Sequence, residues 1–90
     1  MKLWIRSQDK CSLIKVNKLT FEWNIDNEPT IYGYEKYDNY ERLGVYKTKE
    51  RALEVLDEIQ RKIESYKTEF NDSGITLKEV STVVYEMPKN

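Results

Sequence analysis

The chain has 90 residues, of which 39% are hydrophobic and 34% charged, a balance that predicts one small folded domain over residues 1–90. Its formal net charge of −1 does not by itself indicate a polyanionic partner. Histidine is absent and Cys11 is the only cysteine. This composition excludes a structural zinc site, an intramolecular disulfide and any catalytic triad that uses imidazole as its base.

The first residues alternate between apolar and other side chains, which predicts a half-buried strand. Leu3 and Ile5 point to one side, and Trp4 and Arg6 point to the other. Charged residues recur every few positions, so the segment fits neither a signal peptide nor a membrane span. The simplest expectation is a cytoplasmic protein that has no membrane partner.

Residues 12–24 continue the β-character, but their apolar phase slips by one residue. Ile14 and Val16 share one parity, whereas Leu19 and Phe21 share the other. Half of the apolar set would face water without a correction, so the slip predicts a β-bulge or a tight turn near Asn17-Lys18. The composition of residues 24–29 predicts the next turn.

Residues 30–46 contain five of the seven tyrosines and two of the three glycines, and we predict that they form a β-hairpin. A two-residue turn at Asp38-Asn39 would place Tyr34 opposite Leu43 and would bring several favourable cross-strand pairs together. In this register Tyr32 and Tyr34 enter the core.

The same register places Gly33 opposite Gly44, which leaves a shallow notch on the outward face of the hairpin. The simpler alternative is that these glycines permit a bulge or a strong twist. The side chains predicted to lie on this outward face are Tyr37, Tyr40, Arg42 and Tyr46.

Residues 48–70 give the clearest helical pattern. Thr48 is a suitable N-cap after the preceding strand. The apolar residues that follow are spaced alternately by four and three positions, as on one face of a helix; they are Ala52, Leu56, Ile59, Ile63, Tyr66 and Phe70. Residues 71–74 fit a helix stop, and residues 75–88 predict one or two further strands.

The element order is therefore ββββαβ. We predict an α+β fold in which one long helix packs on one face of a four-stranded antiparallel sheet, followed by a C-terminal strand.

Catalytic chemistry is poorly represented in this sequence. It contains no glycine-rich phosphate loop, and the segment from Asn24 to Glu28 lacks the glycine and spacing of a calcium loop. Most helix carboxylates lie off the apolar stripe, where they are normally solvated. Cys11 could act alone as a redox thiol, but a small residue in a turn is the simpler interpretation. We therefore expect a non-enzymatic protein with no metal and no cofactor.

Binding surfaces are the remaining possibility. Residues 1–20 contain five basic side chains and one acidic side chain, so a local basic face can form. Trp4, Arg6 and Lys15 would share the outward side if the N-terminal strands join the hairpin sheet. Aromatic and basic side chains on a sheet can stack bases and contact phosphates, whereas tyrosine, tryptophan and arginine also anchor protein interfaces.

Three segments resemble a group of small uncharacterised proteins from prophages, phages and mobile elements of Gram-positive bacteria. They are "LWIRSQDK", "LGVYKTKERALEVLDEI" and "VYEMP", and they occur in the same order. The resemblance implies a mobile-element context and carries over no catalytic or ligand-binding residue.

The segment "RLGVYKTKERALEVLDEI" is also similar to the third strand and the helix of AP2-type and integrase arm-type DNA-binding domains. Those domains read DNA with the sheet face that points away from the helix. This chain departs from their pattern because its third and fourth strands contain few basic residues.

Three functional hypotheses follow. The first is a binding protein of a phage or mobile element that counters host defence, either by blocking a host protein or by sequestering a nucleotide signal. The second is a DNA-binding module that uses Trp4, Arg6, Lys15, Lys18 and Arg42. The third is a structural homo-oligomer that has the outward tyrosine face as its interface.

Overall fold

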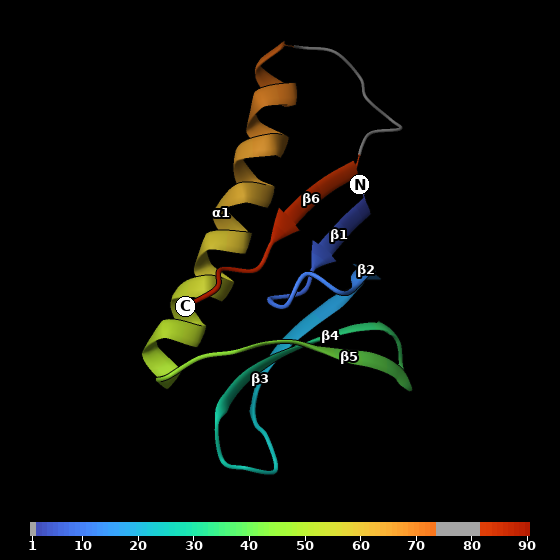
Figure 1. Cartoon of the computed structure of the whole chain (residues 1–90). Coiled ribbons are helices and arrows are strands. Elements are labelled where there is room, and N and C mark those ends of the chain that lie inside the picture. The colour runs from blue at the N-terminus through green and yellow to red at the C-terminus, as the bar shows by residue number, and fades with distance from the viewer. Residues whose placement is uncertain (1, 74–81) are drawn as a thin grey trace.

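The computed structural model describes residues 2–73 and 82–90, except for the side chains of residues 66–73. Its fold is α+β, with one helix and six strands in two small sheets (Figure 1). In chain order the elements are β1 (Lys2–Arg6), β2 (Leu13–Val16), β3 (Lys18–Trp23), β4 (Pro29–Lys36), β5 (Asn39–Val45), α1 (Lys49–Ser73) and β6 (Thr82–Glu86).

The prediction of one four-stranded sheet is wrong, because the strands form two three-stranded sheets. The first has the order β2-β1-β6, with β1 antiparallel to β2 and parallel to β6. The second is the antiparallel sheet β3-β4-β5. Figure 1 shows α1 starting beside the second sheet and running on alongside β6.

The chain passes from one sheet to the other at Asn17, where the sequence predicts a bulge or turn. The backbone N–H of Asn17 donates to the carbonyl oxygen of Tyr34 at 2.8 Å, and its side-chain Nδ2 donates to the carbonyl oxygen of Glu35 at 2.7 Å. These bonds satisfy polar groups that the interrupted ladder leaves over. The apolar side chains before and after the bend consequently face the same core.

The predicted hairpin exists, but its predicted register is wrong. Lys36 pairs with Asn39, so the turn consists of Tyr37 and Asp38. The register shifts twice along the two strands, between Tyr34 and Lys36 and between Ile31 and Tyr32. Each shift adds a residue to one strand, so a single pairing rule cannot describe the whole hairpin.

The glycine notch is also absent from the hairpin, because Gly33 pairs with Glu41 and Gly44 pairs with Ile31. Both glycines are buried. A Cβ atom on Gly33 would lie 2.7 Å from Cδ1 of Leu43 and 2.8 Å from Cγ1 of Val16. Gly33 therefore provides space for two core side chains and leaves no hollow for a ligand.

Helix α1 begins as predicted, because the Thr48 hydroxyl accepts a hydrogen bond from the backbone N–H of Arg51 at 3.0 Å. Ala52 and Ile59 of the predicted stripe are buried. Val55 is fully buried too, although the predicted stripe omits it. The side chains of Tyr66 and Phe70 lie outside the described residues.

Both sheets and the helix contribute to one hydrophobic core. Its buried members are Ile5, Val16, Ile31, Leu43, Tyr46, Ala52, Val55, Ile59 and Met87.

Gln8 joins three separate parts of the chain. Its backbone N–H donates to the carbonyl oxygen of Leu43 at 2.8 Å. Its side-chain Oε1 accepts from the N–H of Val45 at 2.9 Å, and Nε2 donates to the carbonyl oxygens of Val45 at 3.0 Å and Lys89 at 2.8 Å. One amide group thereby fastens the β1–β2 turn to the end of β5 and to the residues after β6.

Candidate binding surfaces

Three tyrosine rings pack on one another across β4 and β5, and we call Tyr32, Tyr34 and Tyr40 the tyrosine face. Tyr34 and Tyr40 are cross-strand partners whose rings stack with centroids 5.1 Å apart. Tyr32 meets Tyr40 edge to face at 6.0 Å. Both distances lie within the range of favourable aromatic pairs. Ile31 and Gly33 alternate with these tyrosines and are buried, so the rings lie on the outer side of the sheet.

Strand β3 supplies the polar neighbours of the tyrosine face. Lys18 holds its ammonium 5.1 Å from the centroid of the Tyr34 ring. The Tyr34 hydroxyl donates to Oε2 of Glu22 at 3.2 Å, and Thr20 donates to the same oxygen at 3.1 Å. Desolvation and the bond to Glu22 raise the pKa of Tyr34. These contacts hold the Tyr34 ring in place on the outer side of the sheet.

The tyrosines differ from their predicted placement in three respects. Tyr32 and Tyr34 lie half-buried on the outer face, whereas the predicted register sends them into the core. Tyr37 is 94% exposed, but it lies in the turn rather than on a strand. Tyr46 is predicted to point outward, yet it is only 4% exposed. Tyr40, at 56% exposed, is on the outward side as predicted.

Tyr46 belongs to the core, and its hydroxyl donates to the carbonyl oxygen of Pro88 at 2.9 Å. Its ring also lies against Gly44, where an added Cβ would approach the Tyr46 hydroxyl to 2.8 Å. Burial raises the pKa of Tyr46 to about 12. The side chain therefore links β5 to the residues after β6 and is not available as a binding residue.

Stability at high pH should report this burial. An unfolded tyrosine has a pKa of about 10, so the stability contributed by Tyr46 is complete below that pH and is lost as the pH rises toward 12. Relative to Tyr46→Phe, we expect the wild-type free energy of unfolding to fall by about 1 kcal/mol more between pH 9 and pH 11. Urea denaturation at the two pH values measures this difference. Tyr85, whose pKa is also raised, remains in both proteins, so equal losses would contradict the prediction.

The second surface lies on the outer side of the sheet β2-β1-β6, and we call it the tryptophan face. Trp4 is on the central strand, with Lys15 of β2 and Val84 of β6 as its direct cross-strand partners. Arg6 pairs with Leu13 two positions further along. The structure therefore brings Trp4, Arg6 and Lys15 to one face as predicted, but on a different sheet from the tyrosines. The complete set is Lys2, Trp4, Arg6, Leu13, Lys15, Thr82, Val84 and Glu86.

The predicted binding residues therefore divide between two sheets. Arg42 is exposed and pairs with Tyr32, so it joins the tyrosine face and lies apart from Trp4. Lys18 also belongs to the tyrosine face. The single apolar and basic surface expected from the sequence does not form, because the bend at Asn17 turns the two halves of the β-structure into separate sheets.

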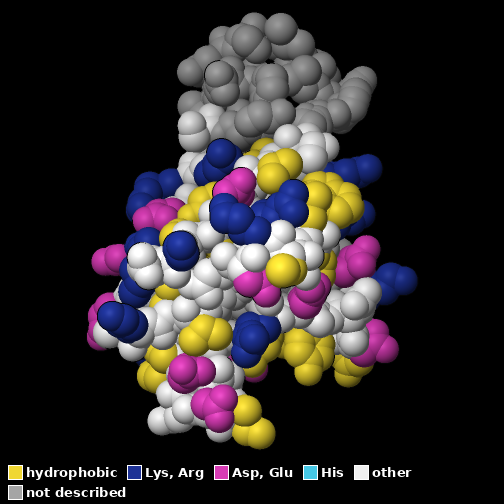
Figure 2. Space-filling model, viewed as in Figure 1, with side chains coloured by type: hydrophobic (Ala, Val, Ile, Leu, Met, Phe, Trp, Pro, Cys, Tyr) yellow, Lys and Arg dark blue, Asp and Glu magenta, His cyan; other side chains and the backbone are white. Residues whose placement is uncertain are grey.

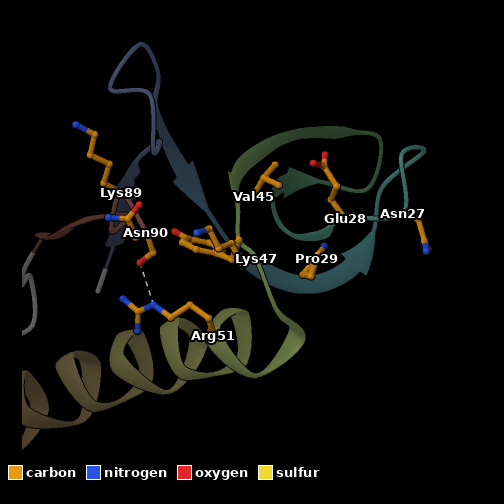
Figure 3. Close-up of a pocket in the computed structure, with 9 residues that line it drawn as sticks. Asn27, Glu28, Pro29, Val45, Lys47, Arg51, Lys89 and Asn90 are labelled. Carbon is orange, nitrogen blue, oxygen red and sulfur yellow. Dashed lines mark hydrogen bonds between the residues drawn. The ribbon is translucent and has the colours of Figure 1, made fainter.

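An open groove of about 690 Å³ lies between the start of α1, the β3–β4 turn and the C-terminal residues (Figure 3). Lys47 and Arg51 lie on one side of the groove, and Glu28 and Pro29 lie across from them. Arg51 donates to the Asn90 carbonyl at 2.9 Å and to the carboxylates of Glu54 and Glu58 at 3.1 and 3.3 Å. These carboxylates offset the charge of Arg51, whereas Lys47 and Lys89, which also line the groove, have no acidic partner within 4 Å among the described residues.

Charges of both signs are mixed on the side of the molecule shown in Figure 2, where Lys and Arg side chains are interspersed with Asp and Glu. That side presents no continuous positive patch of the kind that attracts duplex DNA. No helix within the described ranges is long and apolar enough to cross a membrane.

No protein-family profile, curated protein or solved structure matches the chain. The two resemblances drawn from the sequence therefore stay predictions.

Proposed function

We propose that the chain is a non-enzymatic binding protein that docks on a partner protein through the tyrosine face. The packing of Tyr40 against both Tyr32 and Tyr34 carries the proposal. Aromatic side chains dominate the binding energy of protein interfaces, and rings that are already ordered lose little entropy on binding. Tyr37 at the neighbouring turn extends the surface with a side chain that is almost fully exposed.

The charges around the tyrosine face favour a protein over DNA. The sheet before α1 is the one that AP2-type and integrase arm-type domains would use, according to the resemblance. Its outer face offers Lys18 and Arg42, but Glu22 lies among the rings and bonds to Tyr34. Phosphate backbones require several uncompensated cations, whereas a nearly balanced aromatic surface suits a protein.

The biological context is part of the same proposal. The resemblance of three segments to proteins of phages and mobile elements supports a role against host defence, in which the chain blocks a host protein. The lack of histidine and of phosphate-binding loops supports binding rather than catalysis.

Affinity capture from a lysate of a Gram-positive bacterium tests the proposal, with wild type and Tyr40→Ser as paired baits. We expect a specific protein to be retained by wild type and lost with Tyr40→Ser, since an interface tyrosine of this kind contributes about 2 kcal/mol or more. Lys62→Ser, at an exposed position of α1, is the matched control and should retain the partner.

Two outcomes would refute this function. One is a captured protein that binds the Tyr40→Ser bait as well as it binds wild type. The other is a concentration-dependent dimer in analytical ultracentrifugation that dissociates in the Tyr40→Ser variant, which would assign the tyrosine face to self-association. Circular dichroism of each variant shows whether its fold is intact.

A further inference from the structure

The tryptophan face combines an indole, exposed aliphatic side chains and several cations, a combination that the tyrosine face lacks. Trp4 lies at its centre, with Val84 on one neighbouring strand and Lys15 on the other. Leu13 and Val84 are 46% and 50% exposed, so apolar surface around the indole is open to solvent. The opposite side of the same sheet contributes Ile5, Val16 and Val83 to the buried interior, so the two sides have distinct roles.

The tryptophan face carries more cations than carboxylates, although the whole chain has a net charge of −1. Lys2 and Arg6 flank Trp4 along β1, and Lys15 lies directly across from it. Glu86 is the one acidic residue among the strand positions of this face, and Lys10 neutralises it at 3.1 Å. The surface thus combines a half-buried indole, bordered by the exposed side chains of Leu13 and Val84, with cations that have no acidic partner within 4 Å among the described residues.

This combination matches the chemistry of an unpaired nucleic-acid strand. Bases exposed in a single strand stack on aromatic side chains, while lysine and arginine along the same surface contact the phosphates. In a duplex the bases are already stacked and their flat faces are not accessible to an indole on a sheet. Positions two apart on a strand are separated by about 7 Å, so Lys2, Trp4 and Arg6 form an extended row suited to an extended strand.

We propose that the tryptophan face binds single-stranded nucleic acid, with a base stacked on Trp4 and phosphates held by Lys2, Arg6 and Lys15. Binding of this kind depends on charge and stacking and not on base-edge hydrogen bonds, so it tolerates many sequences. The site is independent of the tyrosine face, which lies on the other sheet.

Fluorescence offers a direct test because the chain has only two tryptophans. In a Trp23→Phe background, Trp4 is the sole indole, and stacking of a base should quench its emission. We expect oligo-dT and oligo-U to quench Trp4 at low salt and a duplex of equal length to bind at least about tenfold more weakly. The two oligomers distinguish DNA from RNA as the source of the strand.

Variants then separate stacking from charge. Trp4→Leu should weaken binding about tenfold or more in an anisotropy assay with labelled oligo-dT. Lys15→Gln should reduce the slope of log affinity against log salt concentration by about 0.7, the contribution of one phosphate contact. Lys62→Gln on α1 is the matched control and should leave both the affinity and the slope unchanged.

The proposal is overturned if oligo-dT and oligo-U fail to bind at low salt, or if duplex binds as tightly as single strand. It is also overturned if Lys15→Gln leaves the salt slope unchanged while the fold is intact by circular dichroism. Loss of a captured protein partner in Lys15→Gln, without any oligonucleotide binding, would instead make this face a protein interface. The oligonucleotide results do not depend on capture through Tyr40, so the two proposals fail separately.

Discussion

Gly33→Ala is expected to destabilise the chain by about 1–3 kcal/mol, because the new methyl group would overlap two core side chains. Its Cβ would lie 2.7 Å from Leu43 and 2.8 Å from Val16, well inside ordinary contact distance. Both neighbours are buried and cannot swing into solvent. Urea unfolding followed by circular dichroism measures the loss, which is a large part of the stability of so small a domain.

A second substitution tests whether overlap is the cause. Leu43→Val removes the Cδ1 atom that lies nearest to the added methyl group. Leu43→Val alone should destabilise the chain by creating a small cavity. The loss of unfolding free energy in the double variant Gly33→Ala/Leu43→Val should be smaller than the sum of the two single losses by at least about 0.5 kcal/mol. Strict additivity would show that overlap with Leu43 is not the source of the loss.

Gln8→Glu should cost about 2–3 kcal/mol at neutral pH, although it changes only one atom of the side chain. Nε2 of Gln8 donates to the carbonyl oxygens of Val45 and Lys89. A carboxylate would place a second acceptor, and a negative charge, against those oxygens. Gln60→Glu, on the exposed face of α1, is the matched control and should change the free energy of unfolding by no more than about 0.5 kcal/mol. Equal losses of unfolding free energy at the two positions would show that the hydrogen bonds of Gln8 do not stabilise the fold.

Features that depend on neighbouring residues were predictable from the sequence. The N-cap requires only that the Thr48 hydroxyl lie three residues before Arg51, whose backbone N–H donates to it. The apolar stripe of α1 follows from the spacing of its apolar residues. The bend at Asn17 is visible as a one-residue slip of apolar phase. The predicted stripe omits Val55 because this residue lies at the margin of the stripe, where spacing alone does not decide burial.

Features that depend on pairing over a distance were not predictable in the same way. Asp38-Asn39 is a suitable turn by composition, yet the chain turns at Tyr37-Asp38, and two register shifts separate the observed pairing from the predicted one. Tyr32 and Tyr34 consequently lie on the outer face of the sheet, whereas the predicted register sends both into the core. Ile31 and Gly33, two residues apart, both lie on the buried face, so the parity of Ile31 is the sequence signal for the inner face.

The composition of the tryptophan face depends on which strand pairs with the free edge of β1. That strand is β6, and no local sequence pattern identifies it. Trp4, Arg6 and Lys15 share a side through the alternation of β1 and its antiparallel pairing with β2. Val84 and Glu86 join them only because β6 lies parallel to β1.

The parallel pairing of β1 with β6 also determines when the chain can fold during synthesis. Lys2 aligns with Thr82, so β1 cannot pair with β6 until the whole stretch between them has been synthesised. Closing a loop of that length costs entropy before any contact repays it, and pairings between distant segments form slowly. The hairpins β3–β4–β5 can form earlier, but one edge of β1 stays unpaired until β6 has emerged. A nascent chain in that state exposes a strand edge to other chains, so slow translation or premature termination near residue 80 would favour aggregation.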